Sequence, residues 1–318
     1  ATQTKKVSDL ATLSLDKPVY LGVHDKEKTS TPESLLQSMV VVPLEHKLNA
    51  LYSFLKSHLR SKIIVFMASC SQVRYAWDLF CSLQPGMPVL CIHGKLIQER
   101  RTKIYFDFLQ RPHAVLLATD VAARGLDFPN VDWVLQLDAP EDKDMYIHRA
   151  GRTARYNKGG KSLVFLLPSE IKMHEQLLDA KIPVKKLTIN PSKTILVTQK
   201  AASLVASNPK LNELAKKAFK SYVRSIYLMP DKETFDVKAL PLDEYATALG
   251  LASTPPTRFL DNVKDRKDLR EKKNVNHKLN KLKQQIKAET LAKRIAKLGQ
   301  TDQTKDDKKR KASQQDDD

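Results

Sequence analysis

The sequence predicts an α/β fold in which helices cover both faces of a parallel sheet, followed by a small helical extension and a basic tail. Short, almost wholly apolar runs such as "KIIVFMAS" and "AVLLATD" alternate with segments of helical periodicity. Strands that are apolar along their whole length are typical of parallel sheets buried on both faces. The composition then changes twice, to a largely helical region after residue 181 and to a Lys-rich one after residue 261.

Six strands and at least three helices are expected in the sheet region. Apolar, β-branched runs indicate the strands, and apolar residues three and four positions apart indicate the helices. The strands are expected near 38–43, 62–69, 88–93, 114–120, 131–138 and 162–168. The helices are expected at 45–59, 71–83 and 98–110, with a helix or turn at 143–154.

Changes in composition divide the chain into four parts. Residues 1–38 are polar and end in a linker-like segment, and 39–180 form the sheet domain. We expect a helical extension over 181–260, which the paired prolines of "TPPTRFL" close. Residues 261–318 are predicted to be one amphipathic basic helix and a disordered tail.

The charge of the chain points to an anionic partner. The 318 residues include 54 basic and 36 acidic side chains, a net charge of +18. Residues 261–318 hold 18 basic and 11 acidic side chains, so +11 belongs to residues 1–260. A basic body as well as a basic tail favours nucleic acid as the partner. No apolar run approaches the roughly 18 residues of a membrane helix, so no membrane partner is expected.

The three cysteines suggest no metal site. Cys70, Cys81 and Cys91 fit no zinc-binding spacing, and we expect them to be reduced thiols packed in the core.

The segment "HRAGRTAR" (148–155) places three guanidinium groups close together. Exposed arginines usually form a solvated basic face, but guanidinium groups also match phosphate oxygens bidentately. Here small residues stand between the arginines and allow another surface to approach, and apolar strands flank the run. We therefore favour a phosphate as the anion that they bind.

Residues 39–170 resemble the second RecA-like domain of DEAD-box RNA helicases. Four segments match the family's motifs in order and spacing, and together they are highly specific. They are "IIVFMASC" (63–70), "HGKLIQERRTKIYFDF" (93–108), "ATDVAARGLD" (118–127) and "YIHRAGRTAR" (146–155). Many members of the family have Gly where this chain has Ala154, a small departure that leaves the arginines in place.

The resemblance implies roles at an ATP site. Arg152 and Arg155 would act as arginine fingers that stabilise the charge of the transferred γ-phosphoryl group. Asp127 would accept hydrogen bonds from the ribose, and Gly125 would let the backbone approach the nucleotide. Four further residues are expected to couple the motifs: His148, Arg149, Asp120 and Arg124. Of these, Asp120 and Arg124 would pair with each other.

The resemblance also implies an RNA groove. Thr119, Gly94, Gln98 and Arg101 would contact phosphates and sugars, which positions a strand without reading its sequence.

Part of the helicase machinery is not in this sequence. No G-x-x-x-x-G-K-[ST] and no D-E-A-D occurs. Residues 1–15 resemble the end of the first RecA-like domain, so we expect that domain to precede this chain. The cofactor implied is ATP with Mg²⁺, and the Mg²⁺ ligands are expected in the preceding domain. This chain alone is then expected not to hydrolyse ATP.

The extension narrows the resemblance to nucleolar DEAD-box helicases of ribosome biogenesis. "KKAFKSYVRSIYLMPDKETFDV" and "EYATALGLASTPPTRFL" are most similar to members that act in small-subunit 18S pre-rRNA processing. This implies a nuclear, nucleolar location, with pre-rRNA, small nucleolar RNA and pre-ribosomal proteins as partners. Phe219, Tyr222 and Tyr227 are expected to pack in a helical core, whereas the nearby basic residues could face RNA: Lys216, Lys217, Lys220 and Arg224.

Three alternatives remain at this stage. A non-catalytic RNA-binding assembly factor of the pre-ribosome could keep the fold as a scaffold, and a related branch of helicases acts on the large subunit. A DNA helicase is disfavoured by the DEAD-type "HRAGRTAR" and by the extension.

Overall fold

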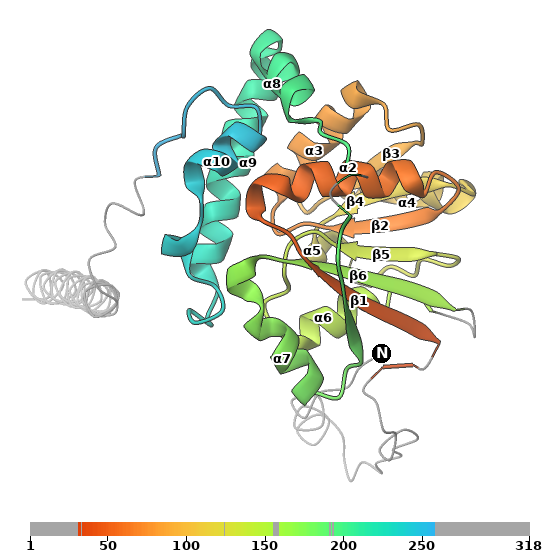
Figure 1. Cartoon of the computed structure of the whole chain (residues 1–318). Helices are drawn as coiled ribbons and strands as arrows, with labels where there is room; N and C mark the ends of the chain where they lie inside the picture. Colours follow the sequence, from red (N-terminus) through yellow and green to blue (C-terminus); the bar gives the residue numbers. More distant parts are fainter. Residues whose placement is uncertain are drawn as a thin grey trace, which may run out of the picture. The chain divides into compact units, whose positions relative to one another are not determined.

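The sheet is parallel throughout and has seven strands. The computed structural model describes residues 31–257 except 33, 124, 155–158, 191 and 193, and only the backbone of residues 122 and 123. The strand order is β3-β4-β2-β5-β6-β1-β7, and all six pairings are parallel (Figure 1). This confirms the predicted fold class. The described residues up to Pro255 belong to one compact unit.

The strands follow the apolar runs of the sequence. They are β1 (Leu35–Val41), β2 (Lys62–Phe66), β3 (Val89–Ile92), β4 (Ala114–Ala118), β5 (Trp133–Gln136), β6 (Gly160–Leu166) and β7 (Val184–Leu187).

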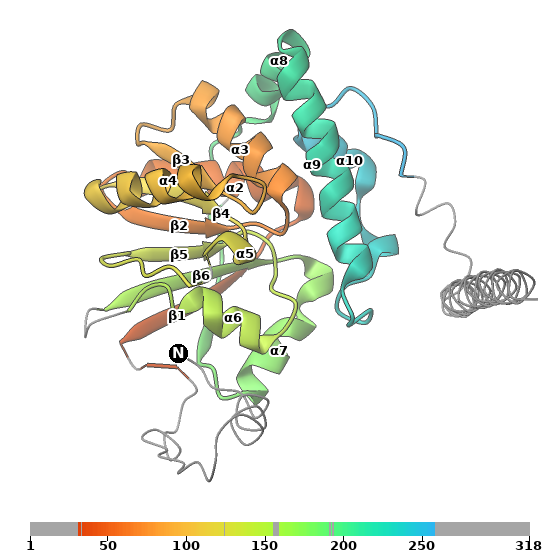
Figure 2. The same cartoon turned by 180° about the vertical axis from the view of Figure 1, so that it is seen from behind.

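Helices cover both faces of the sheet. Figure 1 views the molecule from the side of α2, and Figure 2 from the side of α5 and α6. The α-helices are α2 (Lys47–Ser57), α3 (Cys70–Leu83), α4 (Gln98–Gln110), α5 (Asp120–Ala123), α6 (Lys143–Ala150), α7 (Lys172–Asp179), α8 (Thr198–Ser207), α9 (Pro209–Leu228) and α10 (Leu242–Ala248). Short 3₁₀ turns are η1 (Leu44–His46), η2 (Pro168–Glu170) and η4 (Val237–Ala239).

Capping residues fix where the main helices begin. The Ser69 hydroxyl accepts from the Gln72 amide at the start of α3, and the Asp142 carboxylate accepts from the Met145 amide at the start of α6. Asn208 caps α9, and proline occupies the first helical position, where no backbone donor is needed.

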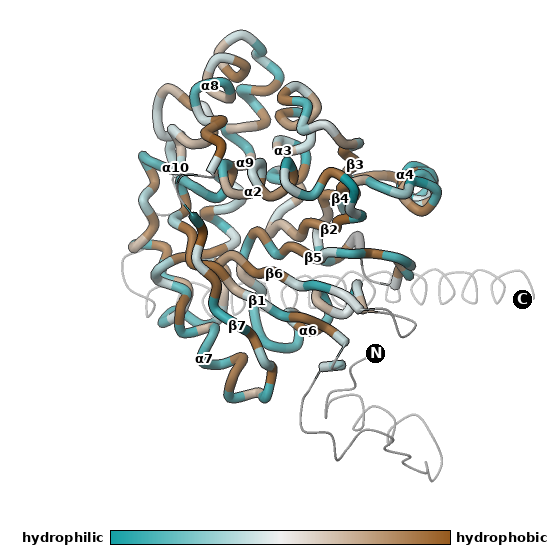
Figure 3. Tube along the Cα trace, turned by 45° about the vertical axis from the view of Figure 1, so that its right-hand side comes forward, coloured by the Kyte–Doolittle hydropathy of each residue, from teal (hydrophilic) through white to brown (hydrophobic). Residues whose placement is uncertain are grey.

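The middle of the sheet is the core of the domain. Every residue of β2 and β4 is buried, and Figure 3 shows these strands mostly in the hydrophobic colour. On one face, Phe108 of α4 and Phe128 pack edge-to-face at 5.8 Å over Leu116 and Val134. Burial on both faces explains why these strands lack the polar alternation of a half-exposed sheet.

Two helices, the four-residue α5 and the longer α7, and one strand, β7, were not predicted. The short amphipathic helix α7 and the edge strand β7 follow β6, and β7 pairs with β1 along Gln37–Val40. Three of the four residues of β7 are exposed, so its sequence lacks the apolar run that marks the inner strands. The sheet thus reaches Leu187, beyond residue 180, where we expected the helical extension to begin; the domain limits themselves stay predictions.

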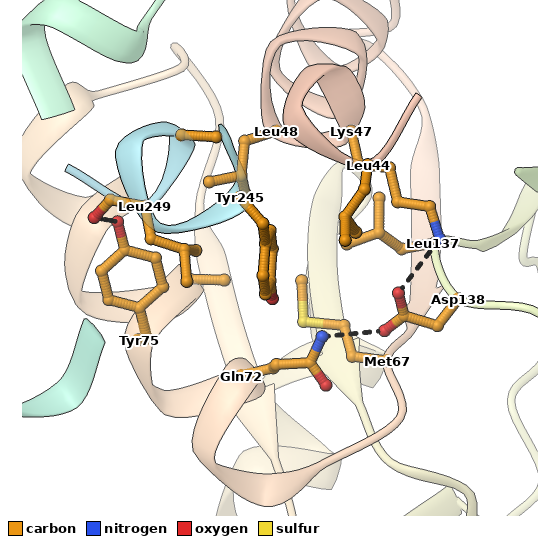
Figure 4. A pocket seen from close by; sticks show the side chains of 12 residues that line it. Leu44, Lys47, Leu48, Met67, Gln72, Tyr75, Leu137, Asp138, Tyr245 and Leu249 are labelled. Atoms are coloured by element: carbon orange, nitrogen blue, oxygen red, sulfur yellow. Dashed lines mark hydrogen bonds and ion pairs between the residues drawn. The ribbon is translucent and has the colours of Figure 1, made fainter. Parts of the chain in front are cut away.

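The extension packs on α2 and α3 rather than standing apart. Helix α9 runs beside α3 in both views (Figures 1 and 2), and Phe219 and Tyr222 are fully buried, as expected. Figure 4 shows Tyr245 of α10 inserted between α2 and α3, where the Tyr75 hydroxyl donates to the Leu249 carbonyl at 2.7 Å. The remaining cavity measures about 30 Å³, room for roughly one water molecule.

Candidate functional site

The predicted site residues gather where the strands end. Gly94 follows β3, and Thr119 and Asp120 follow β4, so they lie at the carboxyl edge of the sheet. Asp138, which was not predicted as a site residue, follows β5 at the same edge. This is the edge at which parallel α/β sheets bind ligands. Helix α6 brings the arginine segment to the same edge, because Arg149 reaches Asp120 from its last turn.

The guanidinium group of Arg149 forms hydrogen bonds to other residues of the domain. Its Nε and Nη2 donate to the two carboxylate oxygens of Asp120 at 2.6 and 2.8 Å, and its Nη1 donates to the Asp138 carbonyl at 2.8 Å. The guanidinium group also lies 5.6 Å from the centre of the Phe66 ring, and the residue is 4% exposed. A bidentate pair this deeply buried fixes the ends of β4 and β5 to α6. Arg149 thus positions the motif and does not face a ligand.

Arg152 has a different environment. It is half-buried, its Nη1 donates to the Leu126 carbonyl at 2.8 Å, and its Nε donates to the His148 carbonyl at 3.2 Å. Both of these partners are neutral peptide oxygens. They orient the guanidinium group beside the loop that carries Asp127 and join the segments 118–127 and 146–155.

The loop 125–127 is held on two sides. The Tyr105 hydroxyl of α4 donates to the Asp127 carbonyl at 2.6 Å, while Arg152 binds the preceding carbonyl. Gly125 has φ +72°, a left-handed backbone that favours glycine, and apart from its chain neighbours no atom of the described residues lies within 4 Å of where a Cβ would stand. The loop therefore presents open backbone next to a half-buried Asp127.

Two residues near the arginines were not singled out from the sequence. The Thr153 hydroxyl, which is buried, donates to the Val131 carbonyl. A Cβ at Gly160, at the start of β6, would collide with this hydroxyl oxygen and with the backbone of Ala154. Ala154 has φ +56°, a left-handed backbone conformation that would suit glycine at this position. These contacts anchor the segment just before Arg155.

Arg155 and Arg124 lie outside the described residues. The predicted pairing of Asp120 with Arg124 is therefore not visible, and Asp120 instead gives both carboxylate oxygens to Arg149. His148 is exposed in the last turn of α6.

The residues predicted to bind RNA form an adjacent group on β3, β4 and α4. Gln98 is the first residue of α4 and accepts from Arg101 Nη1 at 3.0 Å. Gly94 is exposed, and a Cβ there would meet only Val121, at 3.9 Å. The Thr119 hydroxyl, by contrast, is buried and has no hydrogen-bond partner among the described residues. The Thr119 amide donates to the Ile92 carbonyl at 3.4 Å, so a ligand would meet this residue at its backbone carbonyl oxygen rather than at its side chain.

His93 also belongs to this edge. Its Nδ1 accepts from the Lys95 amide at 3.3 Å, and burial lowers its pKa, an effect reinforced by Arg74, Lys95 and Arg100. The neutral imidazole is thus surrounded by cations at the end of β3.

The described part of the chain offers few other kinds of site. It contains no group of three or more His, Cys, Asp or Glu side chains arranged to hold a metal ion. None of its helices has the length and apolar character required to cross a bilayer. Cys70, Cys81 and Cys91 form no disulfide; Cys81 is exposed and the other two are half-buried, so the expectation of core packing was wrong for Cys81.

Comparison with known proteins identifies both parts of the chain. Residues 46–157 match the model of the helicase conserved C-terminal domain, and residues 208–257 match that of the ATP-dependent rRNA helicase SPB4-like C-terminal extension. The chain is 55% identical over 263 residues to a probable ATP-dependent RNA helicase DDX10 from Homo sapiens, a match covering 83% of this chain and 30% of the relative. It is 49% identical over 271 residues to the ATP-dependent RNA helicase dbp4 of Emericella nidulans, covering 84% and 33%. The chain thus spans about a third of these relatives.

Solved structures agree with the sequence matches. The Mss116p DEAD-box helicase domain 2 bound to an RNA duplex superimposes with a TM-score of 0.59 at 27% identity, covering 68% of this chain and 87% of that one. Mss116p bound to single-stranded RNA and AMP-PNP gives a TM-score of 0.70 at 28% identity, covering 82% and 54%. The chain therefore contains a helicase conserved C-terminal domain followed by an SPB4-like C-terminal extension, and most of its length is similar to ATP-dependent RNA helicases and to DEAD-box helicase structures.

Proposed function

We propose that this chain is the part of an ATP-dependent RNA helicase that supplies arginine fingers and half of an RNA groove. The substrates would be precursors of ribosomal RNA and small nucleolar RNA, acted on in the nucleolus together with pre-ribosomal proteins during small-subunit processing. The names of the relatives and the rRNA-helicase type of the extension support this assignment.

The observation that carries the proposal is the different placement of two arginines. The Arg149 guanidinium group binds the Asp120 carboxylate bidentately. Two backbone carbonyls instead orient the Arg152 guanidinium group beside the loop that carries Asp127. A guanidinium group oriented in advance can stabilise charge that develops on a phosphoryl group without reorganising. In the proposed mechanism Arg152 and Arg155 neutralise the γ-phosphate while Asp127 and the Gly125 backbone receive the ribose.

The residues present fit a nucleotide in this arrangement. Gly125 leaves room for a ligand at the backbone, and the Asp127 carboxylate stands on a loop fixed by Tyr105 and Arg152. ATP with Mg²⁺ would supply the phosphoryl group and its charge-neutralising ion. The described residues hold no group of three or more His, Cys, Asp or Glu side chains arranged for the ion. As the resemblance to DEAD-box helicases implies, the proposal places its ligands in a first RecA-like domain.

On the RNA side, Gln98, Arg101 and the backbones of Gly94 and Thr119 would hold phosphates and sugars. These groups lie beside the arginine segment, since Thr119 directly precedes Asp120, which binds Arg149. Because Asp120 binds Arg149 of the arginine segment, a shift of the RNA-contacting loop is transmitted to α6. Coupling of RNA binding to ATP hydrolysis would follow from this connection.

The full-length protein with Arg152→Ala tests the proposal. We expect RNA-stimulated ATP turnover to fall on the order of 10³-fold, since arginine fingers contribute about 10³–10⁵ in rate. RNA binding should persist, because Arg152 lies outside the RNA group. Lys143→Ala, an exposed cation at the other end of α6, is the matched control and should retain activity. Unchanged turnover in Arg152→Ala would instead favour a non-catalytic assembly factor.

A further inference from the structure

Helix α9 carries a stripe of cations on its exposed side. All exposed residues between Leu214 and Tyr227 are basic, and no acidic residue follows Glu213 on this helix. Lys216 pairs with Glu213 at 3.4 Å, but both side chains are about half exposed, so this pair contributes little. The α9 stripe, as named here, consists of Lys217, Lys220 and Arg224.

The opposite side of α9 fixes the direction of the stripe. Leu214, Ala218, Phe219, Tyr222 and Val223 are buried against the domain. The helix cannot rotate without exposing this apolar face, at a cost of about 1.5–3 kcal/mol for each large side chain. The three cations are therefore held toward solvent, spaced over about 10 Å of helix axis.

The stripe leads to the carboxyl edge of the sheet. Helix α9 is antiparallel to α3, since Lys210 pairs with Asp78 at 3.4 Å and the Ser221 and Ser69 hydroxyls lie 2.7 Å apart. Ser69 follows β2 at the edge that also holds Gly94 and Thr119. The end of α9 that carries Lys220 and Arg224 is thus the end nearest the proposed RNA groove.

Further cations connect the stripe with that groove. Arg74 is exposed on α3, between the levels of its two contacts with α9. Arg74, Lys95 and Arg100 are also the cations that act on His93 at the end of β3. Positive charge therefore continues from α9 across α3 to the start of α4.

We propose that the α9 stripe, with Arg74, binds the phosphate backbone of an RNA segment that continues outward from the groove. The inference rests on the proposed function and adds a second RNA surface, on the extension. Lysine and arginine side chains contacting phosphates hold a strand without reading its sequence. RNA is favoured over an acidic protein because the stripe has no exposed aromatic residue and is mostly lysine, which protein interfaces disfavour.

The test is RNA binding by the 318-residue chain with Lys217→Gln, Lys220→Gln and Arg224→Gln combined. Each phosphate contact contributes about 0.7–0.9 to the slope of log K against log salt concentration. We expect the slope to fall by about 2, equally for RNAs of unrelated sequence. The control combines Lys181→Gln, Lys185→Gln and Lys186→Gln, three exposed lysines at the β7 edge with the same change in charge. Its slope should match that of the parent chain, and thermal melts should show that both variants are folded.

Every other outcome overturns the inference. An equal decrease of the salt slope in the α9 variant and in the β7-edge control would mean that net charge alone attracts RNA. An unchanged slope in the α9 variant, together with weaker binding in Gln98→Ala/Arg101→Ala, would leave the proposed groove intact and remove the second surface. Unchanged RNA binding both in Gln98→Ala/Arg101→Ala and in the α9 variant would count against the proposed function itself. Normal RNA binding with loss of binding to poly-glutamate would identify an acidic protein as the partner.

Discussion

At the scale of single residues, identical side chains in one segment have different tasks because their surroundings differ. Arg149 is 4% exposed and paired with a carboxylate, so its charge is part of the folded structure. Removing one partner of such a buried pair costs about 3–5 kcal/mol. Arg152, three residues later, is half-buried and bound by carbonyl groups. We therefore expect substitution of Arg149 to lower stability, whereas under the proposed function substitution of Arg152 affects the site.

Ala154 offers a prediction at this scale. Its φ of +56° costs an L-residue about 1–2 kcal/mol, which glycine avoids. Glycine also increases the freedom of the unfolded chain, at about 0.4–1 kcal/mol. We expect Ala154→Gly to raise the free energy of unfolding by about 0.5–1 kcal/mol, measured by urea denaturation. The control Ala206→Gly, at an exposed helical position of α8, should lower it by about 0.5–1 kcal/mol. Equal destabilisation by both would contradict the strain at residue 154.

At the scale of elements, β6 sets the position of the arginine segment. Gly160, its first residue, lies so close to the segment that a Cβ would come 2.9 Å from Ala154 Cα and even closer to Thr153 Oγ1. Thr153 in turn binds the Val131 carbonyl just before β5. Residues 153 and 154 are thus enclosed between two strands, which fixes the backbone that follows Arg152.

Gly160→Ala tests this packing. The added methyl group meets backbone atoms that cannot move away without displacing residues 153 and 154. We expect a loss of about 1–3 kcal/mol in unfolding free energy and, in the full-length protein, reduced RNA-stimulated ATP turnover. Gly94→Ala serves as the control for stability, since its methyl group would meet only Val121, at 3.9 Å. A stable and fully active Gly160→Ala protein would show that the segment is not held from β6.

At the scale of the whole molecule, the extension and the sheet domain share one interior. Lys47 binds the Asp138 carboxylate at 3.3 Å, Gln72 donates to the same group at 3.1 Å, and Tyr245 of the extension packs beside them (Figure 4). Glu170 lies nearby and fully buried, and accepts from the Leu167 amide. The extension therefore covers charged groups at the sheet edge, so its removal would expose both apolar surface and these charges.

Glu170 makes this junction sensitive to pH. Burial raises its pKa above the ordinary 4.5, and Asp138 adds to this effect, while Lys47 and the Leu167 amide oppose it. The folded state thus favours the protonated acid. The stability that Glu170 contributes is complete below pH 4.5 and is lost as the pH rises through the raised pKa.

Glu170→Gln should remove this dependence, because the amide keeps an oxygen for the Leu167 amide and carries no charge. We expect the stability of the variant relative to the parent chain to increase from pH 4.5 to pH 7.5, measured by urea unfolding across that range. Glu141→Gln, at an exposed loop position, should show a constant difference from the parent. Parallel curves for Glu170→Gln and the parent would contradict a raised pKa.

The sequence determined the parallel α/β fold, where its inner strands lie along the chain and which residues are candidates for the site, because apolar runs and motif spacing are local properties of the chain. The order of the strands in the sheet came from the structure. Only the tertiary structure decided which arginine is buried and which faces the loop, since that depends on Asp120 and Leu126, more than twenty residues away. It also turned the Thr119 hydroxyl inward and added β7, an exposed edge strand stabilised by pairing with β1. The α9 stripe is local in sequence, but its direction follows from the apolar face that packs on α3.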